Sequence, residues 1–323
     1  MNRITQYLGS YSKFDWKTIG NGHAVPVLLD CFKSRLVDGT NTEQYITLGF
    51  YRKSQRERNL FVTNGKTVKL EKISRRGATK EELSTLQNKR LFVKKYAKYV
   101  KRGSLPTKDA SAQEIAAFIE KHGRVLIKPA AETQGRGIEA ADYSPDTVMQ
   151  LAEKLAGKDF LVEQFIKQHP VISAVNPSSV NTIRICTVLD DSHKAHVIGA
   201  ALRSGGKDSV VDNFHHGGVA YPIDIENGVI CGSGRTNSDH KTYARHPATD
   251  TLMIGLKIPN WDTVMNSVVE AAEMSDRIAY IGWDVAITEE GVDIIEANIG
   301  QGCTMWQLDN VGKYPEICRL MRK

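Results

Sequence analysis

Three oxygen-bearing side chains near the end of the chain have types and a spacing that suit a metal site: Asp284, Glu296 and Asn298. They flank Glu289-Glu290-Gly291, which predicts a three-residue β-hairpin loop with glycine in the left-handed position. If Thr288 pairs with Val292, Asp284 lies directly opposite Glu296, and Asn298 follows two residues farther along the same face.

Two carboxylates that face each other on a sheet repel, so a proton or a cation is expected between them. Ligands that are all oxygen atoms select a hard ion, which predicts Mg²⁺ or Mn²⁺ with phosphate and water completing its coordination. Gly282 and Ala286 on the same face are expected to leave room for it. The alternative is a solvent-facing hairpin whose acidic residues have no special role.

A lysine followed by a glycine-containing loop forms a second candidate group, suited to a nucleotide. Lys128 ends the apolar segment Val125–Ile127, and Pro129 and the glycines Gly135 and Gly137 follow it. Backbone N–H groups of such a loop can bind phosphate oxygens, and a lysine on a strand supplies a fixed positive charge. Gly-x-Gly is also common in hairpin turns, so the loop alone does not establish a nucleotide site.

The other glycine-rich sequences argue against the commonest nucleotide-binding folds. Residues 204–209, Ser-Gly-Gly-Lys-Asp-Ser, match the phosphate loop of ATP pyrophosphatases, but residues 210–213 after them favour an extended segment where that loop requires a helix. No G-x-x-x-x-G-K-[ST] sequence occurs, and no G-x-G-x-x-G opens a helix. P-loop and Rossmann folds are therefore not expected.

These candidate residues lie where predicted helices alternate with predicted strands. After about residue 104, helices are expected from Ser111 to Gly123, from Ser144-Pro145 to Gly157 and from Thr263 to Met274. Strands are expected at Val125–Ile127, Phe160–Ile166, Thr182–Leu189 and His196–Leu202, with hairpin turns around Glu226–Gly228 and Glu289–Gly291. Helices mixed with largely antiparallel strands predict an α+β fold.

Before residue 104 the chain is expected to be mainly helical and strongly basic. The predicted helices cover Val25–Val37, Tyr45–Arg58 and Lys80 to about Lys101. Residues 51–102 hold 17 lysine and arginine residues against 4 glutamates, whereas the net charge of the whole chain is +6. A solvated helical face is favoured over a nucleic-acid or lipid surface, because aromatic side chains are not interleaved in the pattern that base stacking needs.

Composition predicts a globular protein of the cytosol. With 323 residues, 41% of them hydrophobic, the chain can bury a sizeable core and form about two domains. No apolar run approaches the ~20 residues of a membrane span, and residues 1–16 lack the apolar segment of a secretory signal. The five scattered cysteines contain no C-x-x-C and predict reduced, buried thiols rather than disulfides or a zinc site.

The order of these motifs resembles that of the ATP-grasp superfamily. Between about residues 85 and 300 the matching elements are Lys89, Lys128-Pro129 with its glycine loop, Phe160–Ile166, Arg184, Asp284 and Glu296-x-Asn298. Three further motifs look like those of the sugar-transfer-associated ATP-grasp group: Asn181–Arg184, Val211–His215 with Gly217-Gly218, and Ile295–Asn298. The linked motifs are far more specific than any one of them alone.

The resemblance implies an ATP-grasp fold, in which two α+β lobes hold ATP between them. Lys89 and Lys128 match the two lysines that contact the phosphates, and the loop that closes over the phosphates would contribute Thr133, Gln134, Gly135 and Gly137. Backbone groups around the adenine would come from Glu163, Gln164, Phe165 and Ile166, and Gln168 or His169 would contact the ribose. Asp284, Glu296 and Asn298 match the metal ligands, in agreement with the hairpin.

Two arginines and a polar segment complete the candidate site. Arg184 and Arg203 lie on successive predicted strands, where planar guanidinium groups suit a two-point grip on a transferring phosphoryl group or an acyl phosphate. The alternative for each arginine is a surface salt bridge. Candidates for binding substrate or deprotonating an amine are Asp212, Asn213, His215 and His216 beside Gly217 and Gly218.

The combined expectation is an enzyme that uses ATP and Mg²⁺ to join a small-molecule carboxylate to an amine through an acyl phosphate. Resemblance to the sugar-transfer-associated group implies a sugar-linked or surface-polysaccharide substrate. A kinase that phosphorylates a hydroxyl and a non-catalytic nucleotide-binding regulator remain as alternatives, and the oligomeric state is left open. The expected domains are 1–104, helical and basic; 105–166, the first nucleotide-binding lobe; and 167–323, the second lobe with the metal and substrate site.

Overall fold

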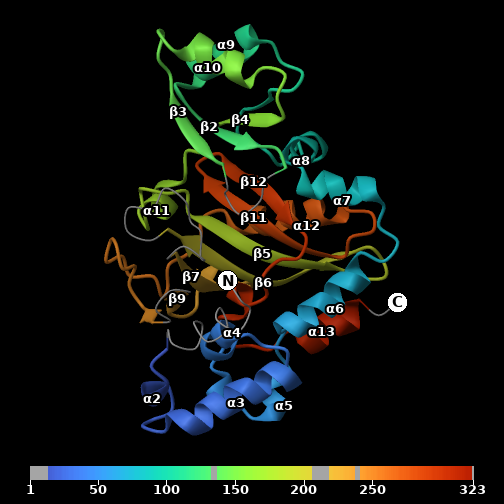
Figure 1. The fold of residues 1–323 in the computed structure, drawn as a ribbon, viewed down its shortest axis with the longest axis vertical. Helices are drawn as coiled ribbons and strands as arrows, with labels where there is room; N and C mark the ends of the chain where they lie inside the picture. The colour runs from blue at the N-terminus through green and yellow to red at the C-terminus, as the bar shows by residue number, and fades with distance from the viewer. Residues whose placement is uncertain (1–13, 132–136, 206–217, 237–240, 322–323) are drawn as a thin grey trace, which may run out of the picture.

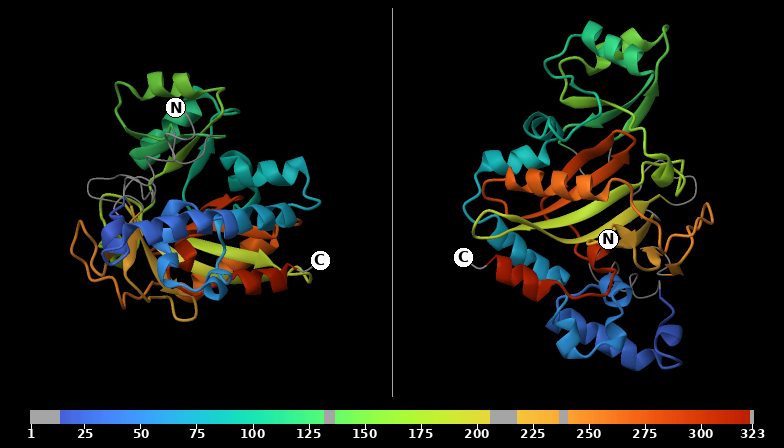
Figure 2. Two further views of the ribbon diagram at one scale, coloured as in Figure 1. Left: turned by 60° about the horizontal axis from the view of Figure 1, so that its bottom comes forward. Right: turned by 180° about the vertical axis from the view of Figure 1, so that it is seen from behind.

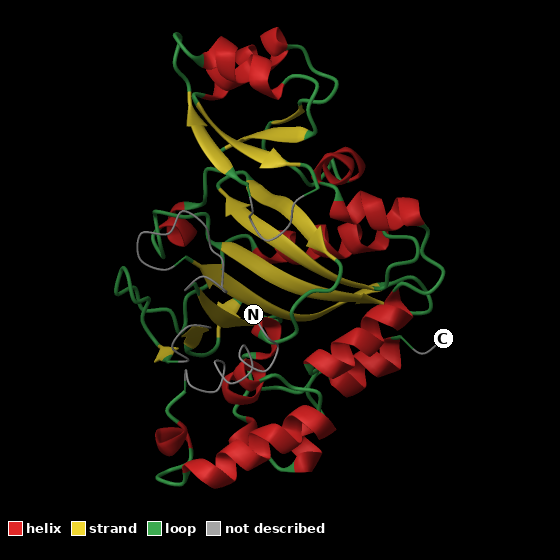
Figure 3. Cartoon of the chain, viewed as in Figure 1, coloured by secondary structure: helices red, strands yellow, loops and turns green. Residues whose placement is uncertain are grey.

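A computed structural model of the chain describes residues 14–131, 137–205, 218–236 and 241–321. Two antiparallel sheets lie one after the other along the long axis, and a helical region occupies the end opposite the smaller sheet (Figure 1). The larger sheet lies in the middle of the molecule, so it contacts the other two parts (Figure 3). Among the described residues, no helix is long and apolar enough to cross a membrane.

The smaller sheet has four strands in the order β1-β4-β2-β3. Their bounds are Ser104–Pro106 for β1, Arg124–Pro129 for β2, Glu139–Asp142 for β3 and Phe160–Gln164 for β4. Helices α9 (Ala112–His122) and α10 (Val148–Leu155) bury an apolar face against it. The Ser111 hydroxyl and the Glu114 carboxylate form the predicted capping box of α9, and Gly123 ends this helix with a φ of +70°.

The larger sheet follows the strand order β10-β9-β7-β6-β5-β11-β12, with β8 paired to β7. The strands are β5 (Thr182–Leu189), β6 (Ala195–Ser204), β7 (Val219–Asp224), β8 (Val229–Ile230), β9 (Gly234–Thr236), β10 (Thr242–Tyr243), β11 (Tyr280–Thr288) and β12 (Gly291–Asn298). β12 is the edge strand nearest the smaller sheet (Figure 1).

Helices cover both faces of the larger sheet. One face packs against α12 (Trp261–Glu273), with α7 (Lys80–Gln87) and α8 (Lys89–Lys95) contributing to the same core. The opposite face is covered toward one end by α6 (Asn64–Ser74), α13 (Tyr314–Leu320) and the 3₁₀ helix η3 (Met305–Gln307). In the view from behind, α12 lies in front of the sheet (Figure 2). The rest of that face carries the polar residues of the candidate site.

The N-terminal helical region and one connection complete the fold. Its elements are α2 (Trp16–Ile19), α3 (Ala24–Val37), α4 (Thr42–Thr47), η1 (Phe50–Arg52) and α5 (Gln55–Arg58), and α11 (Pro170–Ser173) joins the two sheets. A single predicted helix over 45–58 is wrong, because Gly49 adopts a left-handed φ of +63° and separates α4 from η1. The helix predicted over 80–101 is also interrupted, because Asn88 is extended and its side chain caps α8.

Several other boundaries differ from expectation. α6 was not predicted, and α10 begins at Val148 rather than at Ser144-Pro145. β4 ends at Gln164, two residues earlier than expected. Of the five cysteines, Cys31, Cys186 and Cys303 are buried free thiols as predicted, whereas Cys231 is exposed and Cys318 is half-buried.

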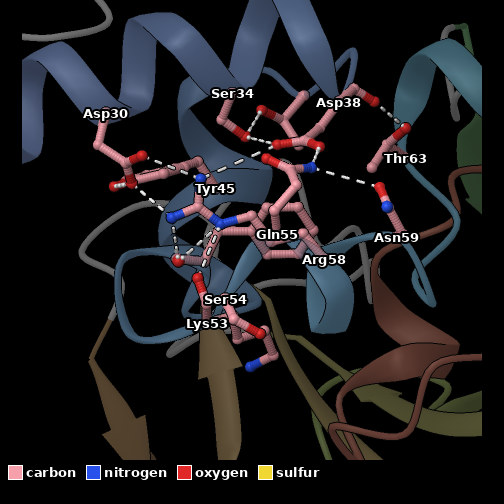
Figure 4. Close-up of polar contacts among 12 residues, drawn as sticks. Asp30, Ser34, Asp38, Tyr45, Lys53, Ser54, Gln55, Arg58, Asn59 and Thr63 are labelled. Carbon is pink, nitrogen blue, oxygen red and sulfur yellow. Dashed lines mark hydrogen bonds and ion pairs between the residues drawn. The ribbon is translucent and has the colours of Figure 1, made fainter.

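The basic segment 51–102 is not one solvated face. Arg58 is buried and donates hydrogen bonds to both carboxylate oxygens of Asp30, at 3.0 and 2.5 Å, and to the Phe50 carbonyl oxygen (Figure 4). Arg102 is buried between the two sheets. Buried charges of this kind are retained where they are paired and hydrogen-bonded, so part of the positive charge is structural.

Candidate functional site

A compact cluster of charged side chains lies where β5, β6 and β11 run side by side. Asp284 on β11 is directly opposite Arg184 on β5 in the sheet register. The Arg184 guanidinium donates to both carboxylate oxygens of Asp284, at 2.5 and 3.0 Å. A nitrogen of Arg203, on the next strand, lies 3.0 Å from the same carboxylate. The two predicted arginines therefore converge on one predicted acid.

The carboxylate hairpin places Asp284 opposite Glu296 and Gly282 opposite Asn298, as expected. The loop and the first pairs of the hairpin differ from the prediction, because Thr288 pairs with Gly291 and the loop has two residues rather than three. A β-bulge at Ile295 then restores the register, since Val285 pairs with Ile294 but Asp284 pairs with Glu296.

The charges of this cluster shift its carboxylates in opposite directions. Burial alone would raise the pKa of Asp284, but the positive charges of Arg184 and Arg203 outweigh burial and hold this pKa well below its ordinary value. The pKa of Glu296 is raised, first by burial and then by the negative charge of Asp284. The positive charges of Arg184 and Arg203 are thus sufficient to keep Asp284 ionised, but they do not outweigh burial and repulsion at Glu296.

The residues of the hairpin fit a hard divalent cation. The Asn298 side-chain NH₂ group donates to Glu296 Oε1 at 3.2 Å and to Asp284 Oδ2 at 3.4 Å, so the three side chains meet at one point, with the amide nitrogen toward the carboxylates. A turn of the amide group exchanges its nitrogen and oxygen, and Asn298 would then present its oxygen to a cation. A cation there would relieve the repulsion that raises the pKa of Glu296. The described residues contain no group of three His, Cys, Asp or Glu side chains arranged for a metal, so a cation at the hairpin would need Asn298 as its third ligand.

The space expected over Gly282 is filled by protein. A Cβ atom at Gly282 would lie 2.2 Å from the side-chain oxygen of Gln301, which is buried against this position. The expectation that Gly282 leaves room for a ligand is therefore wrong, because the missing side chain admits Gln301. Ala286 is fully buried.

A second charged cluster centres on Glu163 and joins the two sheets. Glu163 on β4 is 1% exposed and forms an ion pair with Lys128 on β2. It also accepts from Arg102, at 2.7 and 2.8 Å. Arg102 in turn bonds Asp293 at 2.5 Å and donates to the carbonyl oxygens of Ile294 and Ile295.

Arg102 was not predicted as a site residue, and no sequence signal singled it out of the basic segment. Its contacts fix Lys128 through Glu163 and hold the bulge that presents Glu296. Burial opposes the charge of Glu163, but Arg102 and Lys128 outweigh it and lower the pKa of Glu163 to about 2. The same guanidinium therefore connects the candidate phosphate lysine with the candidate metal hairpin.

The remaining nucleotide candidates are placed as follows. Lys89 begins α8, and its Nζ donates to the Pro129 carbonyl oxygen at 3.2 Å, so it lies beside the loop that follows Lys128. Gly137 has a φ of +67°, in the left-handed region. Thr133, Gln134 and Gly135 lie outside the described residues.

The hinge candidates connect the sheets. Gln164 exchanges hydrogen bonds with Gly103, and Phe165 packs under the Arg124 guanidinium. His169 caps α11, because its Nδ1 accepts a hydrogen bond from the Val171 backbone N–H. The backbone N–H of His169 donates to the Ile287 carbonyl oxygen. The Gln168 amide bonds Ser179 and Asn181, and Ile166 is half-buried.

The polar substrate segment is only partly described. Asp212, Asn213, His215, His216 and Gly217 lie outside the described residues, and Gly218 is buried immediately before β7. A network not predicted from sequence adjoins the start of this segment: the Ser204 hydroxyl donates to Asn181 at 2.7 Å and lies 2.9 Å from Nε2 of His246. Burial lowers the pKa of this histidine.

Comparison with known proteins places this arrangement among ATP-grasp enzymes. The model of the sugar-transfer-associated ATP-grasp family matches residues 78–315. Comparison with curated protein sequences found no match. Biotin carboxylase from Campylobacter jejuni, solved with β,γ-ATP, has a similar fold, with a TM-score of 0.50, 11% identity and coverage of 75% of this chain and 47% of that one.

Two further solved structures are similar. The ATP-grasp ligase PsnB with its minimal precursor gives a TM-score of 0.46, 13% identity and coverage of 75% of this chain and 62% of that one. D-alanyl-alanine synthetase A from Vibrio cholerae gives a TM-score of 0.43 and 13% identity, with coverage of 74% of this chain and 61% of that one. The chain thus spans 47% to 62% of the length of these three proteins.

The predicted α+β, ATP-grasp fold class is confirmed by the family match and by the likeness to biotin carboxylase. The family match extends over about three quarters of the sequence and includes both charged clusters. The chain belongs to the sugar-transfer-associated ATP-grasp family.

Proposed function

We propose that this protein is an ATP- and Mg²⁺-dependent ligase that activates a carboxylate as an acyl phosphate and joins it to an amine. The observation that carries the proposal is the convergence of Arg184 and Arg203 on Asp284, beside Glu296 and Asn298. Such a cluster presents fixed positive charge next to oxygen ligands for a hard cation. Charge of both kinds is needed where a phosphoryl group is transferred between anions.

The proposed reaction has two steps. A carboxylate oxygen of the substrate attacks the γ-phosphorus of ATP, the bond from that phosphorus to the bridging oxygen breaks, and ADP leaves. The amine nitrogen then attacks the carbonyl carbon of the acyl phosphate, inorganic phosphate leaves, and the nitrogen loses a proton to form the amide. Each step moves negative charge onto oxygen atoms that Lys or Arg side chains can stabilise.

The residues divide between the two lobes. Lys128, fixed by Glu163, and Lys89 would hold the ATP phosphates, and Arg184 and Arg203 would stabilise the transferring phosphoryl group. Asp284, Glu296 and Asn298 would hold Mg²⁺, which when bound neutralises phosphate charge. The loop residues Thr133, Gln134, Gly135 and Gly137 would close over the phosphates, and Glu163–Ile166 with His169 would surround the nucleoside.

Family membership is the basis for the substrate class. We infer that the carboxylate or the amine is linked to a sugar, and that the product decorates a sugar precursor or surface polysaccharide in the cytoplasm. Asp212, Asn213, His215, His216, Gly217 and Gly218 would contact this substrate, and one of the histidines would accept the amine proton.

Hydroxylamine trapping tests the ligase proposal. Pools of small carboxylic acids are incubated with the protein, ATP, Mg²⁺ and hydroxylamine in place of an amine, and products are analysed by mass spectrometry. An acyl phosphate is electrophilic at its carbonyl carbon, so a hydroxamate, ADP and phosphate should form together. ADP with a stable phosphorylated product and no hydroxamate would indicate a kinase. No turnover across the pools, with nucleotide bound, would indicate a regulator.

Variants locate the reaction at the proposed centre. Arg184→Ala should reduce hydroxamate formation by at least about a hundredfold, because a charge-assisted contact made in the transition state is lost. Arg184→Lys keeps the charge that Asp284 needs and controls for misfolding. Arg245→Ala, which removes an exposed arginine paired with Asp250, should keep wild-type activity.

A further inference from the structure

A cavity lies between the N-terminal helical region and the larger sheet. Its volume is about 520 Å³, within the range of small-molecule sites. Its walls come from three parts of the chain far apart in sequence: the segment from Thr47 to Phe61, Arg235 on β9, and the segment from Gln307 to Gly312. Among the described residues, none proposed above for the nucleotide or the metal lines it.

Positive charge dominates this cavity. Arg52, Lys53 and Arg235 line it, and Glu57 is the only acid among the described lining residues. The Glu57 carboxylate accepts from the Ser54 backbone N–H and hydroxyl at 2.7 Å, and its charge also acts on Lys53. Three cations therefore face one carboxylate.

The two less exposed cations lack a carboxylate partner. Lys53 Nζ donates to two neutral oxygens, the Leu48 carbonyl at 2.8 Å and Asn310 Oδ1 at 2.7 Å. The Arg235 side chain makes no ion pair or hydrogen bond with any residue that the structure describes. Burial, and after it the charge of Arg52, lowers the pKa of Arg235; burial likewise lowers the pKa of Lys53.

The neighbouring Arg58 is a cation with a structural role, and it differs from Arg235 and Lys53 in having carboxylate partners. It is bonded at both ends of its guanidinium group to Asp30, with Asp38 4.0 Å away (Figure 4). A cation that is partly removed from water is stabilised by an opposite charge, and a bound anion would supply one. The half-buried Arg235 and Lys53, which form no ion pair with a described carboxylate, therefore fit a ligand site better than a structural one.

The cavity lies on the same face of the sheet as the reactive cluster. Arg203 on β6 and Arg235 on β9 are both opposite Ala220 on β7, so their side chains project from one face two strand spacings apart. Two spacings correspond to roughly 10 Å. Ala220 between them is fully buried and packs against Met305 of η3, so protein fills the space directly between the two arginines.

We propose that this cavity binds the phosphate group of a phosphorylated sugar. Arg235, Lys53 and Arg52 supply the charge for a phosphate dianion. The half-buried ring of Tyr51 has the Arg52 guanidinium 5.1 Å from its centroid, and its remaining surface is apolar enough to pack against a sugar ring. The phosphate site does not depend on the proposed ligase function.

Calorimetric titration tests the site with the full chain in the absence of ATP and Mg²⁺. The probes are inorganic phosphate and glucose 1-phosphate, and both should bind. Arg235→Gln and Lys53→Gln should each weaken binding about tenfold or more, because each removes a charged contact. Arg56→Gln is a matched control on an exposed residue outside the cavity, and Lys128→Met is a control in the nucleotide site. Arg56→Gln should bind as the wild type does, and Lys128→Met, which can lose phosphate bound at the nucleotide site, should keep the binding that Arg235→Gln weakens.

The outcomes separate this proposal from the ligase proposal. Absence of binding, or binding that Lys128→Met removes and Arg235→Gln does not, would overturn the phosphate site. Tighter binding of glucose 1-phosphate than of phosphate supports a sugar ligand, and equal or weaker binding overturns that part. Arg235→Gln should keep the thermal stabilisation by ATP and Mg²⁺; absence of that stabilisation in the wild type would count against the ligase and leave the cavity result standing.

Discussion

Replacing Glu163 by glutamine removes the negative charge that lies between Lys128 and Arg102. The pKa of Glu163 is lowered from 4.5 to about 2 because these two cations outweigh the effect of burial. By linkage, this difference corresponds to about 3 kcal/mol of stability at neutral pH. Removing one partner of a buried ion pair typically costs about 3–5 kcal/mol. Both arguments predict that Glu163→Gln loses about 3 kcal/mol.

Thermal unfolding followed by circular dichroism measures this loss. About 2 °C per kcal/mol is expected for a chain of this size, so Tm at pH 7 should fall by about 6 °C. A carboxyl group with a lowered folded-state pKa stabilises the protein above its unfolded-state pKa, and this contribution is lost as the pH falls toward 2. The difference between wild type and variant should therefore shrink by roughly a third between pH 7 and pH 3.5.

A matched substitution separates this effect from a general effect of removing charge. Glu289→Gln breaks an exposed pair with Lys167 in the hairpin loop and should change Tm by less than about 1 °C. Equal Tm values for Glu163→Gln and wild type at pH 7, or a difference that does not change with pH, would refute the assignment of Glu163 as the charge that fixes Lys128 and Arg102.

Three further predictions concern the site. ATP with Mg²⁺ should stabilise the fold by about 2.7 kcal/mol at a hundredfold excess over Kd; an unchanged Tm in a thermal shift assay would contradict nucleotide binding. Glu296→Gln should lower turnover by orders of magnitude while Tm stays equal or rises, because the raised pKa of Glu296 makes its charge unfavourable at pH 7; wild-type activity at limiting Mg²⁺ would exclude it as a ligand. Gly282→Ala should lower Tm because its Cβ meets Gln301 at 2.2 Å, whereas Gly302→Ala, with no atom within 4 Å, should be tolerated; equal effects in the two variants would argue against this packing.

Local sequence signals predicted the elements whose formation depends on neighbouring residues. β5 has the predicted bounds, Thr182 to Leu189, and α9 has the predicted capping box and glycine stop. Hydrophobic periodicity and capping chemistry act over a few residues, so a single sequence suffices to recognise them. The same signals failed at Gly49 and Asn88, where one residue interrupts an otherwise helical pattern.

The pairing of Asp284 with Glu296 was predicted, although the predicted loop length was wrong and the bulge was not foreseen. The loop is one residue shorter than expected, and the bulge at Ile295 adds one residue back. Turn chemistry is local, but this bulge is bonded by Arg102, which comes from a distant part of the chain. The register therefore depends on a contact that the hairpin sequence does not contain.

The sequence by itself determined which residues are candidates for the chemistry: the acids of the hairpin, the strand lysine and the two arginines. Only the tertiary structure decided how they are held, because Arg102, Glu163 and Asp293 come together across 191 residues of sequence separation. It also decided which cations are paired, as with Arg58, and which are not, as with Arg235. A charge is visible in a sequence, but its partner and its burial exist only once the chain is folded.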